Sequence, residues 1–64
     1  MYILKSERVK QGISQKNLAR RLNITQQHLC RIENEKSIPR KKLMIEIAKE
    51  LDSDVMTLFF SNEK

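Results

Sequence analysis

The 64-residue chain is too short to bury a large hydrophobic core, and its sequence offers neither a disulfide nor a metal site to compensate. Domains of about 40 to 70 residues often rely on a disulfide, a bound metal or a partner chain. Cys30 is the single cysteine and His28 the single histidine, which leaves neither an internal disulfide nor a four-ligand zinc site. We therefore expect one domain over residues 1–64, stabilised by close helix packing and by self-association.

The sequence carries no recognisable membrane or export signal. No apolar run approaches the roughly 18 residues needed to span a bilayer, and none resembles the hydrophobic part of a signal peptide. The unpaired Cys30 agrees with a reducing compartment. We expect a soluble, cytoplasmic protein with no membrane partner.

Positive charge is concentrated in the first two thirds of the chain. The whole chain has thirteen basic and eight acidic side chains, a net charge of +5. Residues 1–42 hold eleven basic and three acidic side chains (+8), whereas residues 43–64 hold two and five (−3). This division suggests one face presented to a polyanion. Charge alone does not separate DNA, RNA and anionic membrane, and a basic solvated surface without a partner has the same composition.

Apolar residues recur at helical spacing in five short blocks, which predicts an all-α fold. The first block runs from about Ile3 to Gln11, with Leu4 and Val9 directed inward, and ends at Gly12. Two further helices are expected over residues 15–22 and 26–34, after the candidate N-caps Ser14 and Thr25.

Two more helices are predicted over about residues 40–61. Pro39 marks the beginning of the first, since proline is favoured at a helix N-terminus. Asp52 or Asp54 caps the second. The apolar residues of the two helices are Met44, Ile47, Ala48, Leu51, Val55, Leu58 and Phe59.

Residues 15–34 have the pattern of two short helices packed across a tight turn. Ala19 supplies a small residue where the backbones approach, and Asn23 tolerates the left-handed conformation that the turn needs. The corner would be closed by Leu18, Leu22, Ile24, Leu29 and Ile32. This is the spacing of a DNA-binding helix-turn-helix, although an ordinary αα-hairpin also shows apolar pairs at such intervals.

The polar face of the second helix favours the DNA-binding interpretation. Gln26, Gln27, Arg31 and Asn34 lie opposite the apolar residues of that helix. Glutamine can read adenine, and arginine guanine, through paired hydrogen bonds at major-groove base edges. An αα-hairpin does not require this face.

The stretch LKSERVKQGISQKNLARRLNITQQHLCRIENEKSIP, residues 4–39, resembles the Cro and C1-type (XRE) helix-turn-helix family, which includes the lambdoid phage repressors. The segment LMIEIAKELDSDVMTLF, residues 43–59, is similar to the fourth and fifth helices of that family. The resemblance implies a five-helix, lambda-repressor-like domain with its helix-turn-helix at helices two and three. It also implies a bacterial or phage-encoded protein associated with the nucleoid.

The resemblance assigns roles to matching positions. The base-reading positions are Gln26, Gln27 and Arg31; the backbone-contacting positions are Gln15, His28, Asn34, Lys36 and Arg40. For His28, a plain solvated side chain is an equal alternative. Arg8 and Glu33 match a buried ion pair between helices one and three, the alternative being two unrelated surface charges.

Three positions depart from the glycines usual in this family. Glu35 stands two residues after the matched Glu33, where a non-glycine residue in a left-handed conformation costs about 1 kcal/mol or more. We therefore expect Asn34 to take that conformation, and we expect Glu35 to place a negative charge near the phosphate path. Asp52 and Asn23 tolerate left-handed geometry better.

The combined hypothesis is a transcriptional repressor that binds the major groove of an inverted-repeat operator as a homodimer. Ile45, Met56 and Phe60 lie off the apolar stripes and are the expected dimer contacts. The alternative is an antitoxin-like protein-interaction module with secondary DNA binding, although only residues 61–64 follow the last helix. An RNA binder would need aromatic stacking residues in the basic region.

No catalytic arrangement, cofactor site, metal site or small-molecule site is indicated by the sequence, and we do not expect an enzyme. Cys30 lies beside Arg31. Its oxidation would add charge or bulk near the groove, but a small side chain without a role is the simpler interpretation.

Overall fold

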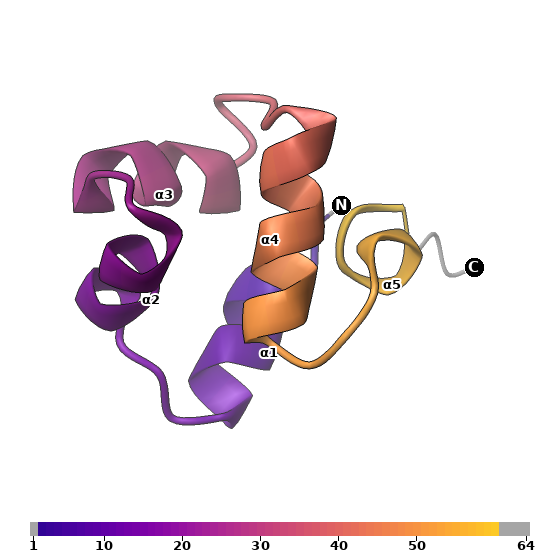
Figure 1. Ribbon diagram of the computed structural model, residues 1–64, viewed down its shortest axis with the longest axis horizontal. Helices are drawn as coiled ribbons and strands as arrows, with labels where there is room; N and C mark the ends of the chain where they lie inside the picture. The colour runs from indigo at the N-terminus through magenta and orange to yellow at the C-terminus, as the bar shows by residue number, and fades with distance from the viewer. Residues whose placement is uncertain (1, 61–64) are drawn as a thin grey trace.

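The computed structural model describes residues 2–60, which form five α-helices and the segments that connect them (Figure 1). They are α1 (Leu4–Lys10), α2 (Gln15–Leu22), α3 (Gln26–Glu33), α4 (Lys41–Glu50) and α5 (Val55–Phe59). No strand occurs within these residues. The all-α prediction is confirmed. In Figure 1, α4 lies in the middle of the molecule, with α2 and α3 on one side and α5 on the other.

The core is built from side chains of all five helices and of the first residue after α4. Its fully or nearly fully buried members are Leu4, Leu18, Ala19, Leu22, Leu29, Ile32, Ile47, Ala48, Leu51, Leu58 and Phe59. Tyr2 packs its ring edge-on against Phe59, with ring centroids 5.0 Å apart, and Ile3 N donates to Leu58 O at 3.0 Å. The N-terminal segment is thereby attached to the last helix.

Three helices begin at a side chain that caps their first turn. Ser14 Oγ accepts from Asn17 N at 3.0 Å, and Thr25 Oγ1 accepts from His28 N at 3.0 Å. At α5 the cap is Asp54, whose Oδ1 accepts from Thr57 N at 2.7 Å. These bonds satisfy amides that a helix N-terminus leaves unpaired, and the expected caps are confirmed, with Asp54 rather than Asp52 at α5.

The hydrogen bond from Thr57 also changes the acidity of its acceptor. Backbone and side-chain hydrogen bonds from Thr57 lower the pKa of Asp54 from its ordinary value of 3.8. Ionised carboxylates are the better acceptors at a helix N-terminus, so the cap is strongest above that value.

Four helices end in the same backbone arrangement, and only one of these ends uses glycine. Gly12, Asn23, Glu35 and Asp52 have φ values of 73°, 60°, 60° and 53°. Each donates its N–H to the carbonyl three residues earlier, and the following residue donates to the carbonyl five residues earlier, at 2.8–3.2 Å. This is the Schellman motif. Left-handed geometry at Asn23 and Asp52 agrees with the sequence prediction.

The left-handed position after α3 was predicted wrongly. Asn34 has φ −91° and is the C-cap of α3, whereas Glu35 takes the left-handed conformation. The hydrogen-bond register explains this, because Glu35 N and Lys36 N reach the carbonyls of Ile32 and Arg31 only when the reversal falls at residue 35. Two hydrogen bonds therefore outweigh the local cost of a non-glycine residue.

Other expectations differ in detail. Val9 was expected inward, but 59% of it is exposed. The inner face of α1 is defined by Leu4 and by Arg8 four residues later, and Val9 lies a further 100° around the helix. At the other end, α4 begins at Lys41, two residues after Pro39, with Arg40 as its N-cap.

Two helix ends also fall short of the sequence prediction. Ile3 and Gln11 are the caps of α1, and Asn34 follows the last residue of α3. α5 ends at Phe59 with Phe60 as its C-cap, and the expected extension to residue 61 lies outside the described residues.

Candidate nucleic-acid interface

The corner between α2 and α3 is closed by apolar side chains from both helices. Leu18, Leu29 and Ile32 are fully buried, and Leu22 is 7% exposed. Ala19, at 2% exposure, leaves room for the two backbones to approach. The turn itself is held by Ile24 N, which donates to Ala19 O at 3.0 Å. α3 is therefore fixed against α2 at its inner face, and its outer face remains uncovered.

The outer face of α3 carries the expected base-reading residues. Gln26, Gln27 and Arg31 are all exposed. Gln27 and Arg31 are four residues apart on the helix and line one shallow hollow of about 300 Å³, together with Thr25, His28 and Ser37. Residues at this spacing share a helix face, so both side chains are presented at the same part of the surface.

A continuous set of hydrogen bonds joins the interior to this face. Arg8 Nε donates to Glu33 Oε2 at 2.7 Å, and Arg8 Nη2 donates to Glu33 Oε1 at 3.2 Å. Gln15 Nε2 donates to the same Glu33 Oε1 at 3.0 Å, and Gln26 Nε2 donates to Gln15 Oε1 at 3.2 Å. A third Arg8 bond, from Nη1, reaches the carbonyl of Ile13 at 2.8 Å.

This network restrains side chains on both helices of the corner. The Arg8 and Glu33 side chains are 9% and 1% exposed, so the ion pair expected at the seam of α1 and α3 lies inside the domain. Gln15 is half-buried, and Gln26 is exposed at the beginning of α3. A carboxylate that accepts three N–H bonds has well-satisfied oxygens. The network therefore aligns Gln15 and Gln26 before any ligand arrives.

The remaining backbone-contacting candidates surround the same face. Asn34 and Lys36 are exposed beyond the end of α3, and Arg40 is exposed at the beginning of α4. Asn34 Nδ2 donates to Cys30 Sγ at 3.4 Å. Glu35 accepts from Tyr2 N through Oε2 at 3.0 Å, and its expected position near the phosphate path stays a prediction. Its charge is thus directed at the N-terminal segment.

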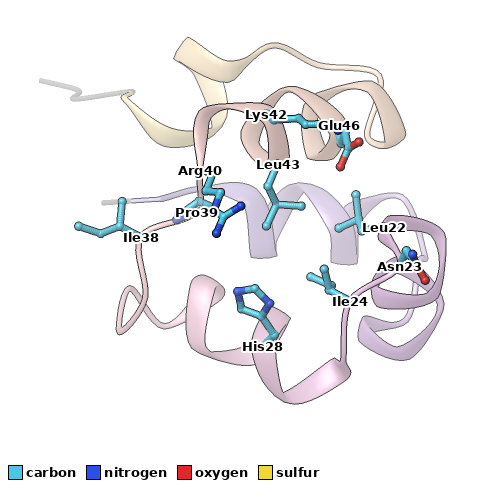
Figure 2. Close-up of a pocket in the computed structure, with 10 residues that line it drawn as sticks. All are labelled: Leu22, Asn23, Ile24, His28, Ile38, Pro39, Arg40, Lys42, Leu43 and Glu46. Atoms are coloured by element: carbon cyan, nitrogen blue, oxygen red, sulfur yellow. The ribbon is translucent and has the colours of Figure 1, made fainter.

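His28 and Arg40 also line a larger hollow of about 550 Å³ between α3 and α4 (Figure 2). Sequence reasoning missed this feature. Its one sequence signal is Ile38, an apolar residue in an otherwise polar loop, which is 82% exposed.

The expected dimer contacts lie on α4, on α5 and at the C-cap of α5. Ile45, Met56 and Phe60 are 40%, 67% and 54% exposed. Their exposure leaves them accessible to a partner, and their role stays a prediction. Within residues 2–60 no group of three or more potential metal ligands lies together. Among the same residues no helix is both long and apolar enough to cross a membrane.

A sealed two-helix corner with an exposed polar second helix, set in a five-helix bundle, defines a lambda-repressor-like helix-turn-helix domain. The helix-turn-helix family model of the Cro/C1 type matches residues 4–58, and the chain belongs to this family. It is a family of DNA-binding transcription regulators. A comparison with curated proteins finds no match.

Proposed function

We propose that this protein is a sequence-specific repressor that binds an inverted-repeat operator as a homodimer. The observation that carries the proposal is the outer face of α3, where Gln27 and Arg31 share one hollow and Gln26 is held by Gln15. The hydrogen bond to Gln15 restrains Gln26 before binding, so Gln26 loses less conformational freedom on forming base contacts. Gln27 and Arg31 are exposed on the same helix. Base reading is therefore assigned to Gln26, Gln27 and Arg31.

Backbone contacts are assigned to residues around that face. Gln15 lies at the N-terminus of α2, where unpaired amides favour an anion. His28, Asn34, Lys36 and Arg40 are exposed around α3 and the beginning of α4. These contacts would set the register on DNA without reading sequence.

The decisive experiment begins with selection of bound sites from random duplex DNA, which yields the half-site and its spacing. Gln27→Ala and Arg31→Ala should each weaken binding to the selected site by about 1 to 3 kcal/mol and leave binding to random DNA nearly unchanged. Lys36→Ala is the matched comparison and should weaken both alike. Equal losses for all three variants on every sequence would refute the division into readers and backbone contacts.

Homodimerisation is proposed because one small domain buries too little surface for high specificity. Two recognition helices would then lie about 34 Å apart, one turn of DNA. The exposed apolar contact is assigned to Ile45 on α4, Met56 on α5 and Phe60 at the C-cap of α5. Sedimentation equilibrium at high micromolar concentration, with and without the selected DNA, tests this: a strict monomer in both conditions contradicts it.

The antitoxin-like alternative makes a different prediction. It requires a stoichiometric protein partner whose removal leaves only weak DNA binding. Affinity purification of the tagged protein from its native host, followed by mass spectrometry, distinguishes the two functions.

A further inference from the structure

The hollow between α3 and α4 is bounded by three separate segments of the chain (Figure 2). Leu22, Asn23 and Ile24 come from the α2–α3 turn, and His28 comes from α3. The rest of the lining comes from the α3–α4 loop and the first turns of α4: Ile38, Pro39, Arg40, Lys42, Leu43 and Glu46. Its volume of about 550 Å³ lies within the range of small-molecule sites.

One part of this hollow is apolar. Leu22, Ile24 and Leu43 point toward the same space in Figure 2. Ile24 and Leu43 are only partly buried by the protein itself. Ile38 lies at the outer end of the hollow with 82% of its surface exposed. An apolar ligand would remove this surface from water.

The other part is polar and carries positive charge from Arg40 and Lys42. Arg40 extends from one side and His28 from the other toward the middle of the hollow (Figure 2). Lys42 adds a second positive charge, and Glu46 is the single acidic residue among the described residues that line the hollow. A guanidinium next to an imidazole suits a carboxylate, which Arg can bind through two parallel hydrogen bonds.

From these two parts we infer that the hollow binds a small amphiphilic carboxylate. Its carboxylate lies between Arg40 and His28, and its hydrocarbon part lies on Leu22, Ile24 and Leu43. The excess of positive over negative lining charges selects an anion, and the apolar part selects against inorganic anions.

A regulatory consequence rests on the proposed DNA-binding function. Arg40 and His28 are assigned there to the DNA backbone, so the carboxylate and a phosphate compete for the same two side chains. Ligand and DNA would then weaken each other's binding by the same factor, as linkage requires. The hollow is thus an effector site within the DNA-binding domain.

Binding is measured first without DNA, using octanoate as the probe and methyl NMR of Leu22, Ile24 and Leu43 as the readout. Octanoate should shift these methyl signals saturably. Acetate, inorganic phosphate and octanol, which each lack one half of the ligand, should fail to saturate over the same concentrations. Saturation by acetate or phosphate as tight as that by octanoate would show a simple anion site and overturn the inference, as would saturation by octanol or no saturation at all.

Variants separate the two parts of the site. Arg40→Gln should weaken octanoate binding about tenfold, the loss expected for a charge-assisted hydrogen bond, whereas Lys5→Gln, an exposed lysine on α1 outside the hollow, should not. Leu43→Gln should also weaken binding, and its matched control is Met44→Gln, which removes similar apolar surface one residue further on. Ile38→Ala in the loop repeats the apolar test without altering a helix. Equal effects of Leu43→Gln and Met44→Gln would contradict an apolar part built on Leu43.

The same NMR measurement tests two other possible occupants of the hollow. If the methyl signals shift with protein concentration alone, a second copy covers the hollow. If an acidic apolar tetrapeptide binds more tightly than octanoate, the partner is a protein segment. Either result overturns the small-molecule assignment.

Competition is then measured by fluorescence anisotropy of a labelled DNA duplex. Octanoate should raise the apparent Kd for DNA with the wild-type protein. Leu43→Gln, which lies outside the proposed DNA-binding surface, should keep its DNA affinity and lose this response. Octanoate binding without any effect on DNA affinity would overturn the regulatory role. If the protein binds no DNA at all, the proposed function fails, while the NMR measurement still decides whether the hollow is a site.

Discussion

Replacing Glu33 by alanine should remove a large part of the stability of this domain. The Glu33 side chain is 1% exposed and accepts two hydrogen bonds from Arg8 and one from Gln15, at 2.7, 3.2 and 3.0 Å. Its loss leaves a guanidinium buried without a countercharge, which typically costs about 3 to 5 kcal/mol. A domain of this length has a total stability of about 3 to 10 kcal/mol, so the variant should lose between about a third and all of its stability and should unfold at a much lower urea concentration than wild type.

The measurement is urea unfolding followed by circular dichroism at 222 nm. The matched control is Arg21→Ala, which breaks the exposed pair between Arg21 and Glu50, 3.9 Å apart. Exposed pairs contribute about 0 to 1 kcal/mol, so this variant should unfold near the wild-type urea concentration. If the Glu33 and Arg21 variants lose equal stability, the buried pair does not stabilise the seam between α1 and α3.

A double variant tests the cause of the loss. Arg8→Met combined with Glu33→Leu removes both charges and retains apolar volume, and such replacements are often neutral or stabilising by about 1 to 4 kcal/mol. The double variant should therefore be more stable than Glu33→Ala alone. If both are equally destabilised, the cost comes from lost packing rather than from an unpaired charge.

Three further predictions concern helix ends. Ser14→Ala removes the cap of α2 and should lower the free energy of unfolding by about 1 kcal/mol in urea titrations. The control is Ser6→Ala, which removes a hydroxyl that caps no helix. An equal loss in both variants would show that the effect does not come from capping. The Glu35→Gly variant should be more stable than Glu35→Ala by about 1 kcal/mol, because both variants lose the hydrogen bond from Tyr2 N and only alanine keeps the left-handed strain. Equal melting temperatures of the two variants would contradict this. Since the pKa of Asp54 is lowered below 3.8, the stabilisation by the ionised Asp54 cap is complete above that pH and is lost as pH falls through the folded-state pKa. Thermal unfolding from pH 5 to pH 2 should therefore show a smaller acid-induced decrease in Tm for Asp54→Asn than for wild type. An identical dependence of Tm on pH in the two proteins would refute the linkage.

Local signals predicted the helices well because their causes are local. A cap such as Ser14 or Thr25 acts within three residues of itself. Residues that favour a turn, such as Asn23 and Asp52, took the expected left-handed conformation. These features depend on nearby atoms, so the sequence contains most of the information that determines them.

The left-handed position at Glu35 was missed because of the local hydrogen-bond register after α3. Other predictions failed where distant segments decide the outcome. Arg8 takes the inner position on α1 because Glu33, 25 residues away, meets it there, and Val9 is consequently turned outward. The hollow between α3 and α4 depends on how Leu43 and Arg40 lie relative to His28 and Ile24. Spacing along the chain does not specify that arrangement. The polar face of α3 was predictable because its members belong to one helix.

The shortness of the helices has a consequence for how the protein's activity is controlled. The longest, α4, has ten residues and α3 has eight, whereas isolated helices shorter than about 12 to 15 residues are only marginally stable in water. α3 therefore keeps its shape only while the rest of the domain is folded around it. Its amides should exchange with solvent hydrogen at the rate set by global unfolding. The folded population thus equals the population able to bind DNA, so a substitution anywhere in the core that unfolds the domain also removes its DNA-binding activity.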